Sequence, residues 1–255
     1  MDQTIINNIL EASANDGKIF SNEQDFQFDF AKALNDLDEV EYVKLEALSL
    51  SLDWRQIQDL ANNRQKINRD KKEYTDIVVK LRNGEYIAIE LKFKTPDKLC
   101  CYENEQSGRI LTMVQGAYDI NAYDFITDIK RLENINNRHF YKDINISRGY
   151  AIMLSNYSHY RYNDYSGSSI WMNYGINHGR VLNGLLTFNN GLTSYTIKNR
   201  TFDAITLKGV YNLLWRDYPL ENYNDYKDAN RSVHPGFSYL VVEVNPQPCK
   251  NQLIP

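Results

Sequence analysis

Two carboxylates and one amine stand at strand-like spacing in a short part of the sequence. Asp76 begins one run of alternating apolar and polar residues, and Glu90 and Lys92 end a second such run. Both runs predict strands, and the Asn-Gly pair between them, Asn83 and Gly84, predicts a hairpin turn. Two carboxylates brought together by a hairpin repel each other unless a cation lies beside them. A hard divalent ion with oxygen ligands is the natural partner, and Lys92 supplies a further positive charge.

The apolar residues set the register of this hairpin. A two-residue loop would put the apolar faces of the two strands on opposite sides of the sheet. A three-residue loop over 82–84, with Gly84 in the left-handed position of a bulged turn, instead pairs Ile77 with Ile89. Asp76 then lies directly across from Glu90, where side chains have Cβ atoms about 4.5–5.5 Å apart.

The alternative is a solvent-facing strand that carries ordinary surface charges. Val78 and Ala88 share the face of Asp76, Glu90 and Lys92, which favours a face that is at least partly covered. We therefore prefer a metal-binding site to a solvated face.

Asp76 followed, after a hairpin, by Glu90-Leu91-Lys92 resembles the motif of the PD-(D/E)XK nuclease superfamily, which has the restriction endonuclease-like fold. Thr75 stands where the motif has its proline. The resemblance implies Asp76, Glu90 and Lys92 as catalytic residues. It also implies Mg²⁺, for which Mn²⁺ substitutes, held by Asp76, Glu90 and the backbone carbonyl of Leu91.

The order of the predicted elements agrees with this resemblance. The periodicities predict these elements, in chain order: a helix over 4–14, a helix over 21–37 with Ser21 and Gln24 as a capping box, a strand over 41–50, a short helix over 53–60, the hairpin, a polar loop over 97–107, a mostly helical stretch over 108–136 broken near Asn121, and a buried strand over 149–154. The resemblance implies an α/β protein whose restriction endonuclease-like core, αβββαβ, has a mixed central sheet flanked by helices. We expect one nuclease-like domain over 1–255, with the core at about 21–155 and an α+β extension at about 156–245 packed on it.

Within the extension, the pattern predicts an antiparallel hairpin over 181–197 and a helix or helical turn over 205–215. A polar loop over 221–235 and a strand over 237–244 follow. The many aromatic residues of 155–179 could stack on bases or pack a long loop, and we favour packing.

Two helices carry further candidates. By resemblance, Glu23 in the first helical turns approaches the metal, although acids there also favour the helix dipole, and the two interpretations weigh equally. Gln115 and Tyr118 lie at an interval at which several nucleases of this superfamily contact DNA or support the site. The surrounding run also resembles a bacterial group within the superfamily that has no assigned biochemical activity. For Asp128 and Arg131 we favour a salt-bridged helix face.

The most basic stretch of the chain directly precedes the strand of Asp76. Its cationic residues are candidates for nucleic-acid binding, because Lys and Arg contacts with phosphates supply most sequence-independent affinity. They are Arg64, Lys66, Arg69, Lys71 and Lys72. The alternative is a solvated polar loop.

Composition limits the other possibilities. The net charge of −4 means that DNA binding must come from local basic patches. The three cysteines have no metal-ligand spacing and do not suggest a disulfide framework, and no signal peptide or membrane-spanning run is present, so we expect a cytoplasmic protein.

The sequence therefore predicts a Mg²⁺-dependent deoxyribonuclease, and an endonuclease rather than an exonuclease. Cutting both strands needs two sites, which would suit a homodimer. The alternative is a non-cleaving nucleic-acid-binding or interaction module that retains the nuclease fold. The intact set of Asp76, Glu90 and Lys92 favours the enzyme.

Overall fold

The structure is a computed structural model of the chain. It describes residues 1–52, 54–68, 71–95, 100–104, 108–112, 117–140, 144–163, 169–220, 224–225 and 236–248. Arg69 and Gln115 lie outside the described residues.

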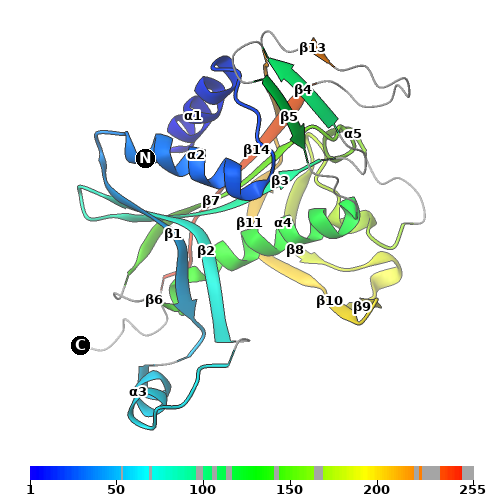
Figure 1. Cartoon of the computed structure of the whole chain (residues 1–255). Helices are drawn as coiled ribbons and strands as arrows, with labels where there is room; N and C mark the ends of the chain where they lie inside the picture. The colour runs from blue at the N-terminus through cyan, green and yellow to red at the C-terminus, as the bar shows by residue number, and fades with distance from the viewer. Residues whose placement is uncertain are drawn as a thin grey trace.

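A seven-stranded mixed sheet forms the centre of the molecule, with the strand order β12-β14-β7-β3-β2-β1-β6 (Figure 1). Its strands are β1 (Val40–Leu50), β2 (Lys72–Leu81), β3 (Tyr86–Lys94), β6 (His139–Phe140), β7 (Ile146–Ser155), β12 (Arg216–Tyr218) and β14 (Phe237–Val244). Within this sheet β3 and β7 pair in parallel, and the other neighbours are antiparallel. The chain is therefore an α/β protein with a mixed sheet, as the sequence predicts.

Helices cover both faces of the sheet. Helices α1 (Gln3–Asn15) and α2 (Glu23–Asn35) pack on one face, and α4 (Tyr118–Glu133) packs on the other. Alternation along the strands explains the two layers, because successive side chains point to opposite faces. Ile77 and Ile89 join the core beneath α1 and α2, whereas Val78 and Ala88 join the core beneath α4. The face that carries Asp76, Glu90 and Lys92 is thus covered, as predicted.

The hairpin between β2 and β3 has the predicted register. Ile77 pairs with Ile89, and the backbone N–H of Leu81 donates to Glu85 O at 2.8 Å, which leaves three residues in the loop. Gly84 has φ +89°, in the left-handed region that favours glycine.

The start of α2 differs from the prediction by one residue. Asn22, not Ser21, is the N-cap, and its side chain accepts a hydrogen bond of 2.9 Å from the backbone N–H of Asp25. The carboxylate of Asp25 in turn accepts from the backbone N–H of Ser21 at 3.0 Å. Asp25 therefore takes the part predicted for Gln24. The helix ends at Asn35, two residues early.

The chain between β3 and α4 was predicted wrongly. Strands β4 (Cys100–Asn104) and β5 (Gly108–Thr112) pair with each other, where a loop and the start of a helix were expected, and β13 (Asn224–Asp225) adds to β4. Helix α4 begins only at Tyr118 and runs through Asn121 without a break. Ala117 has φ +62°, and a residue in the left-handed region cannot continue a right-handed helix.

The extension after β7 also pairs differently from the prediction. Strand β8 (Val181–Leu186) pairs with β11 (Ile205–Asn212), and β9 (Ser194–Ile197) pairs with β10 (Arg200–Asp203), so the hairpin over 181–197 is wrong. The segment predicted as a helix over 205–215 is strand β11, whose side chains alternate between buried and exposed up to Leu207, as in a half-buried strand. The strand predicted over 237–244 is confirmed as β14, which enters the central sheet beside β7.

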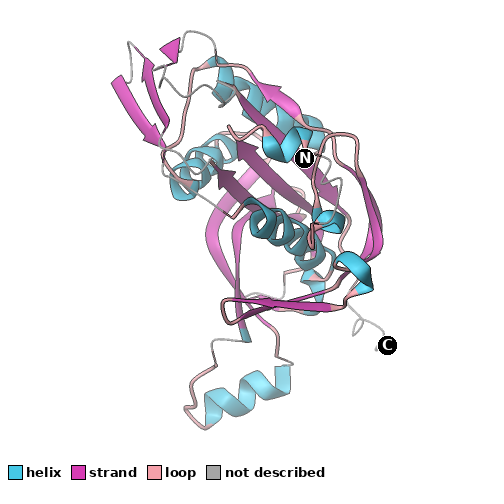
Figure 2. Ribbon diagram, turned by 90° about the vertical axis from the view of Figure 1, so that its right-hand side faces the viewer, coloured by secondary structure: helices cyan, strands magenta, loops and turns pink. Residues whose placement is uncertain are grey.

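Short helices complete the described fold. They are α3 (Trp54–Asn62), α5 (His159–Tyr162) and the 3₁₀ turns η2 (Ile135–Asn137), η3 (Met172–Tyr174) and η4 (Asn189–Gly191). Figures 1 and 2 show α3 at the tip of an arm made by β1 and β2, away from the body of the molecule. The aromatic segment after β7 packs, as favoured, since Tyr160, Trp171 and Tyr174 are buried.

Candidate active site

Asp76 lies where β2 and β3 separate. The regular pairing of the two strands ends at Ile77 and Ile89, one residue before Asp76 and Glu90, so these acids continue the predicted register but are not a paired rung. The carboxylate of Asp76 instead accepts a hydrogen bond of 2.7 Å from the backbone N–H of Leu91. Burial raises the pKa of Asp76 to about 6, and the hydrogen bond from Leu91 and the charge of Lys92 oppose that rise.

Glu90 is buried, with 3% of its surface exposed. Its Oε1 lies 3.2 Å from the guanidinium of Arg131 on α4. Burial raises the pKa of Glu90 well above its ordinary value, and the charge of Arg131 counters this most strongly, while Asp128 and Asp76 raise it further. Glu90 thus sits in an acidic cluster with a cation already at one oxygen.

Lys92 points to the same face as Glu90 and meets the same helix. Its Nζ lies 2.9 Å from Oδ2 of Asp128 and donates to the carbonyl of Leu91 at 3.3 Å. Burial lowers the pKa of Lys92, but the carboxylates of Asp128, Glu23 and Asp76 outweigh burial and raise the pKa on balance. Lys92 is therefore a fixed ammonium group, suited to holding a negative charge and not to accepting a proton.

Glu23 approaches from the first turn of α2, on the opposite face of the sheet. Its Oε2 accepts hydrogen bonds from the backbone N–H of Phe93 at 3.0 Å and from Nζ of Lys94 at 3.1 Å. Glu23 also contributes to the electrostatic environment of both Asp76 and Lys92, which places it near them. The structure therefore gathers Asp76, Glu90 and Lys92 where β2 and β3 separate, whereas Glu23 reaches the end of β3 from the other face of the sheet.

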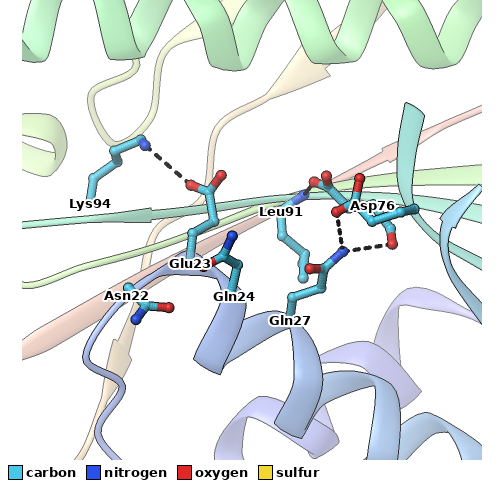
Figure 3. A pocket seen from close by; sticks show the side chains of 8 residues that line it. Asn22, Glu23, Gln24, Gln27, Asp76, Leu91 and Lys94 are labelled. Carbon is cyan, nitrogen blue, oxygen red and sulfur yellow. Dashed lines mark hydrogen bonds and ion pairs between the residues drawn. The ribbon is translucent and has the colours of Figure 1, made fainter. Parts of the chain in front are cut away.

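A cavity of about 300 Å³ opens between the start of α2 and the separating strands (Figure 3). Polar residue types line most of it, and neither Glu90 nor Lys92 is among the lining residues, which are Asn22, Glu23, Gln24, Gln27, Glu46, Asp76, Leu91 and Lys94. Asp76 and Glu23 reach it from different elements, so a ligand there would touch both.

Gln27 and Glu46 are members of this site that the sequence did not reveal. The Gln27 side chain donates to the backbone carbonyl of Asp76 at 2.8 Å and to Oε1 of Glu46 at 3.1 Å. Glu46 lies on β1, opposite Asp76 of the neighbouring β2, between the pairs Leu45–Ile77 and Ala47–Thr75. It has φ +47° in the middle of the strand. Such a strained backbone conformation is uncommon for a residue other than glycine and is often found at functional sites.

Asp128 and Arg131 were also missed as site residues. Their expected ion pair is present, with Arg131 Nη1 3.0 Å from Asp128 Oδ1, but both residues also reach across to β3. The spacing of charges along a helix predicts which charges pair on that helix, but not which strand the helix packs on.

The basic stretch is not brought to the carboxylates. Arg64 and Lys66 are exposed beyond α3, and Lys72 is exposed at the start of β2. Lys72 precedes Asp76 by four residues of extended strand, or about 13 Å. A DNA duplex could span that distance, but these side chains do not line the site itself.

Tyr118 is the first residue of α4 and is 37% exposed. Its ring packs edge-on against the ring of His159, with centroids 4.3 Å apart, and near Tyr157 at 5.9 Å. The neighbours of the Tyr118 ring are thus aromatic. Tyr118 precedes Asp128 by about ten residues on α4, so the two residues are about 15 Å apart along the helix.

The oxygen-rich donor set suits a hard divalent cation. Asp76, Glu90, one oxygen of which pairs with Arg131, and the Leu91 carbonyl all offer oxygen ligands. Mg²⁺ commonly takes only one or two carboxylates and completes its shell with water and phosphate. Within the described ranges no three His, Cys, Asp or Glu side chains are arranged as a complete metal cage. The residues therefore fit Mg²⁺ shared with a substrate better than a closed structural metal site.

Comparison with known proteins gives no match. No family model, no curated protein and no solved structure matches this chain. In the part of the chain that the structure describes, no helix has both the length and the apolar character needed to cross a bilayer.

Proposed function

We propose that the protein is a Mg²⁺-dependent nuclease that hydrolyses phosphodiester bonds of DNA. One observation carries the proposal: Asp76, Glu90 and Lys92 converge where β2 and β3 separate, and Glu23 reaches the end of β3 from α2. The order α2, β1, β2, β3, α4, β7, with β7 parallel to β3, also supports a restriction endonuclease-like core.

Asp76, Glu90 and the Leu91 carbonyl would hold the ion. A bound divalent ion supplies Lewis-acid chemistry, which polarises the phosphate and makes water a stronger nucleophile at neutral pH. Because Leu91 N–H donates to Oδ2 of Asp76, that carboxylate is oriented from within the protein, and its other oxygen is free of this bond.

Lys92 and Glu23 take separate parts. The ammonium of Lys92, fixed by Asp128, would stabilise negative charge that develops on the phosphate. Glu23, bonded to Phe93 N–H and Lys94, would fix the end of β3 against α2 and close the acidic side of the cavity. Mn²⁺ should replace Mg²⁺, since both take oxygen ligands.

One observation favours a second candidate, a non-cleaving nucleic-acid-binding module with the same fold. Arg131 lies 3.2 Å from Glu90, where an ion would be expected in an active site. If Arg131 replaces the ion permanently, the protein would bind DNA without cutting it.

The deciding experiment incubates purified protein with supercoiled, linear duplex and single-stranded DNA, each with Mg²⁺, Mn²⁺ or EDTA. We expect metal-dependent cleavage that is lost in Asp76→Asn and whose kcat falls by about 10²–10³-fold in Lys92→Met. Lys80→Met is the matched control, because Lys80 lies on the same hairpin but pairs with Glu41 at 2.7 Å, away from the site. Cleavage that persists in Asp76→Asn overturns the proposed mechanism. DNA binding without cleavage under every metal condition favours the second candidate.

A further inference from the structure

Arg131 is bound by acceptors from three directions. Its Nε lies 3.4 Å from Glu73, its Nη1 lies 3.0 Å from Asp128, and its Nη2 serves both the Tyr74 carbonyl at 2.6 Å and Glu90 at 3.2 Å. Of the five N–H donors of the guanidinium, three make hydrogen bonds inside the protein, and the contact with Glu90 is an ion pair. Arg131 therefore has little capacity left for a phosphate and is suited to fixing the side chain of Glu90.

Asp128 is used on both oxygens. Oδ1 meets Arg131 at 3.0 Å, and Oδ2 meets Lys92 at 2.9 Å. Asp128 is 4% exposed, so its hydrogen bond with Arg131 and its ion pair with Lys92 are both made out of bulk water, where opposite charges attract more strongly than at the surface. One carboxylate thus links the guanidinium that holds Glu90 to the ammonium of Lys92.

We propose that Asp128 and Arg131 are positioning residues of the active site, which α4 supplies to β3. This inference rests on the proposed function. Arg131 sets Glu90 for the divalent ion, and Asp128 sets Lys92 for the reacting phosphate. Arg131 contacts Glu90 and Asp128 contacts Lys92, so each should mainly affect a different step, and Asp128→Asn keeps one oxygen that can still accept from Arg131.

The charges of the cluster agree with this division. With all carboxylates ionised, the outer pairs Glu73–Arg138 and Glu23–Lys94 are each neutral, and the inner acids Asp76, Glu90 and Asp128 face Lys92 and Arg131, which leaves one negative charge. A divalent ion together with one phosphodiester group adds one positive charge in total and makes the cluster neutral. The cluster is therefore balanced with Arg131 in place, and binding of ion and substrate does not require Arg131 to leave.

The test measures two quantities on the whole protein: Mn²⁺ affinity by calorimetry in the absence of DNA, and kcat for DNA cleavage at saturating Mn²⁺. Arg131→Met should weaken Mn²⁺ binding by about 10–100-fold, as loss of a residue that orients a metal ligand does. Asp128→Asn, which keeps the size of the side chain, should leave Mn²⁺ affinity within about threefold and lower kcat by about 10–100-fold.

Arg138→Met is the matched control. Arg138 contacts Glu73 at 2.5 Å, and Arg131 contacts the same residue at 3.4 Å. Among the described residues, however, Arg138 forms no ion pair with Glu90 or Asp128. It should change neither quantity by more than about threefold. Thermal unfolding of each variant identifies any that do not fold, and Arg131→Lys then replaces Arg131→Met. A lysine keeps the charge but cannot span the four acceptors of Arg131, so the loss of Mn²⁺ affinity should remain.

A double-mutant cycle decides whether Asp128 acts through Lys92. In a Lys92→Met background, Asp128→Asn should lower kcat no further, because the group that it positions is gone. Additive losses in the cycle, or equal effects of Arg131→Met and Arg138→Met on Mn²⁺ affinity, overturn the positioning roles. Wild-type protein that neither binds Mn²⁺ nor cleaves DNA overturns the proposed function itself, and this result is separate from failure of the positioning roles in an active enzyme.

Discussion

The carboxylate of Asp76 and the backbone N–H of Leu91 form a 2.7 Å hydrogen bond across the gap where β2 and β3 stop pairing. A side chain thus replaces a rung of the sheet. The bond ties the orientation of the Asp76 carboxylate to the position of Leu91, whose carbonyl also accepts from Lys92. Two parts of the proposed site are therefore coupled through the backbone of one residue, Leu91.

The stability of the metal-free protein should depend on pH through Asp76. Burial raises the pKa of this carboxyl from 3.8 to about 6 in the folded state. Since the folded-state pKa is the higher one, this group favours folding most below about pH 4, and the contribution is lost as pH rises through that interval. A shift of this size corresponds to about 3 kcal/mol.

Urea unfolding in EDTA at pH 4 and pH 7 measures this effect. Asp76→Asn lacks the titrating group, so its free energy of unfolding relative to wild type should be about 2–3 kcal/mol higher at pH 7 than at pH 4. A difference between the two proteins that stays constant with pH would show that Asp76 is well solvated.

Gln27 should stabilise the protein through its contact with the backbone of Asp76. Gln27→Leu removes the donor to the Asp76 carbonyl and to Glu46, and a buried polar group left without a partner costs about 1–3 kcal/mol. Chemical denaturation measures the loss. Gln24→Leu is the control, since Gln24 lines the same cavity but is exposed. Equal losses in both variants would contradict a specific role for Gln27.

The basic stretch should act on DNA affinity without acting on the chemistry. Arg64→Ala with Lys66→Ala should reduce the salt dependence of DNA binding by about 1 in log–log slope for each phosphate that the variant no longer binds, with kcat unchanged at saturating DNA. Fluorescence anisotropy over a salt series gives the slope. Lys198→Ala, exposed at the turn between β9 and β10, should leave it unchanged. An unaltered slope in the double variant would mean that this loop is only a solvated loop.

Glu133 should be a strong determinant of stability away from the site. Its Oε1 accepts from the backbone N–H groups of Lys208 and Gly209, both at 2.7 Å, and from the Tyr211 hydroxyl at 2.8 Å. These bonds hold β11 where its register shifts between Leu207 and Val210. Because hydrogen bonds to a charged group are worth about 1.5–3 kcal/mol each, Glu133→Ala should cost at least about 3 kcal/mol.

Tyr211→Phe provides the graded comparison, because it removes one of the three bonds and should cost about half as much or less. Thermal or urea unfolding measures both variants. A Glu133→Ala protein as stable as wild type would show that water replaces the carboxylate at this bulge.

The sequence predicts local features of this fold well and long-range contacts poorly. The register of the β2–β3 hairpin follows from the spacing of Ile77 and Ile89 around Gly84, since a shift by one residue would reverse both faces. The pairing of β8 with β11 could not be predicted in this way, because nearly twenty residues separate the strands and the intervening β9 and β10 pair with each other.

The site divides along the same line. The hairpin and its alternation are enough to predict Asp76, Glu90 and Lys92 as neighbours, and the resemblance to the nuclease superfamily suggests Glu23. The contacts of Arg131 with Glu90 and of Gln27 with Asp76 depend on how α4 and α2 pack on the two faces of the sheet. The left-handed conformation of Glu46 has no sequence signal, because any residue can be forced into it by its surroundings.

The position of β14 has a consequence for synthesis of the protein. Strand β14, formed by Phe237–Val244, lies between β7 and β12, so β7 has an open hydrogen-bonding edge until residues 237–244 have left the ribosome. No strand of the central sheet that is made before β14 pairs with this edge of β7. During translation it is therefore a place where nascent chains could pair with one another. The sheet is therefore completed well after β7 is made, and the parallel β3–β7 pair that underlies the proposed site becomes an interior pair only when β14 arrives.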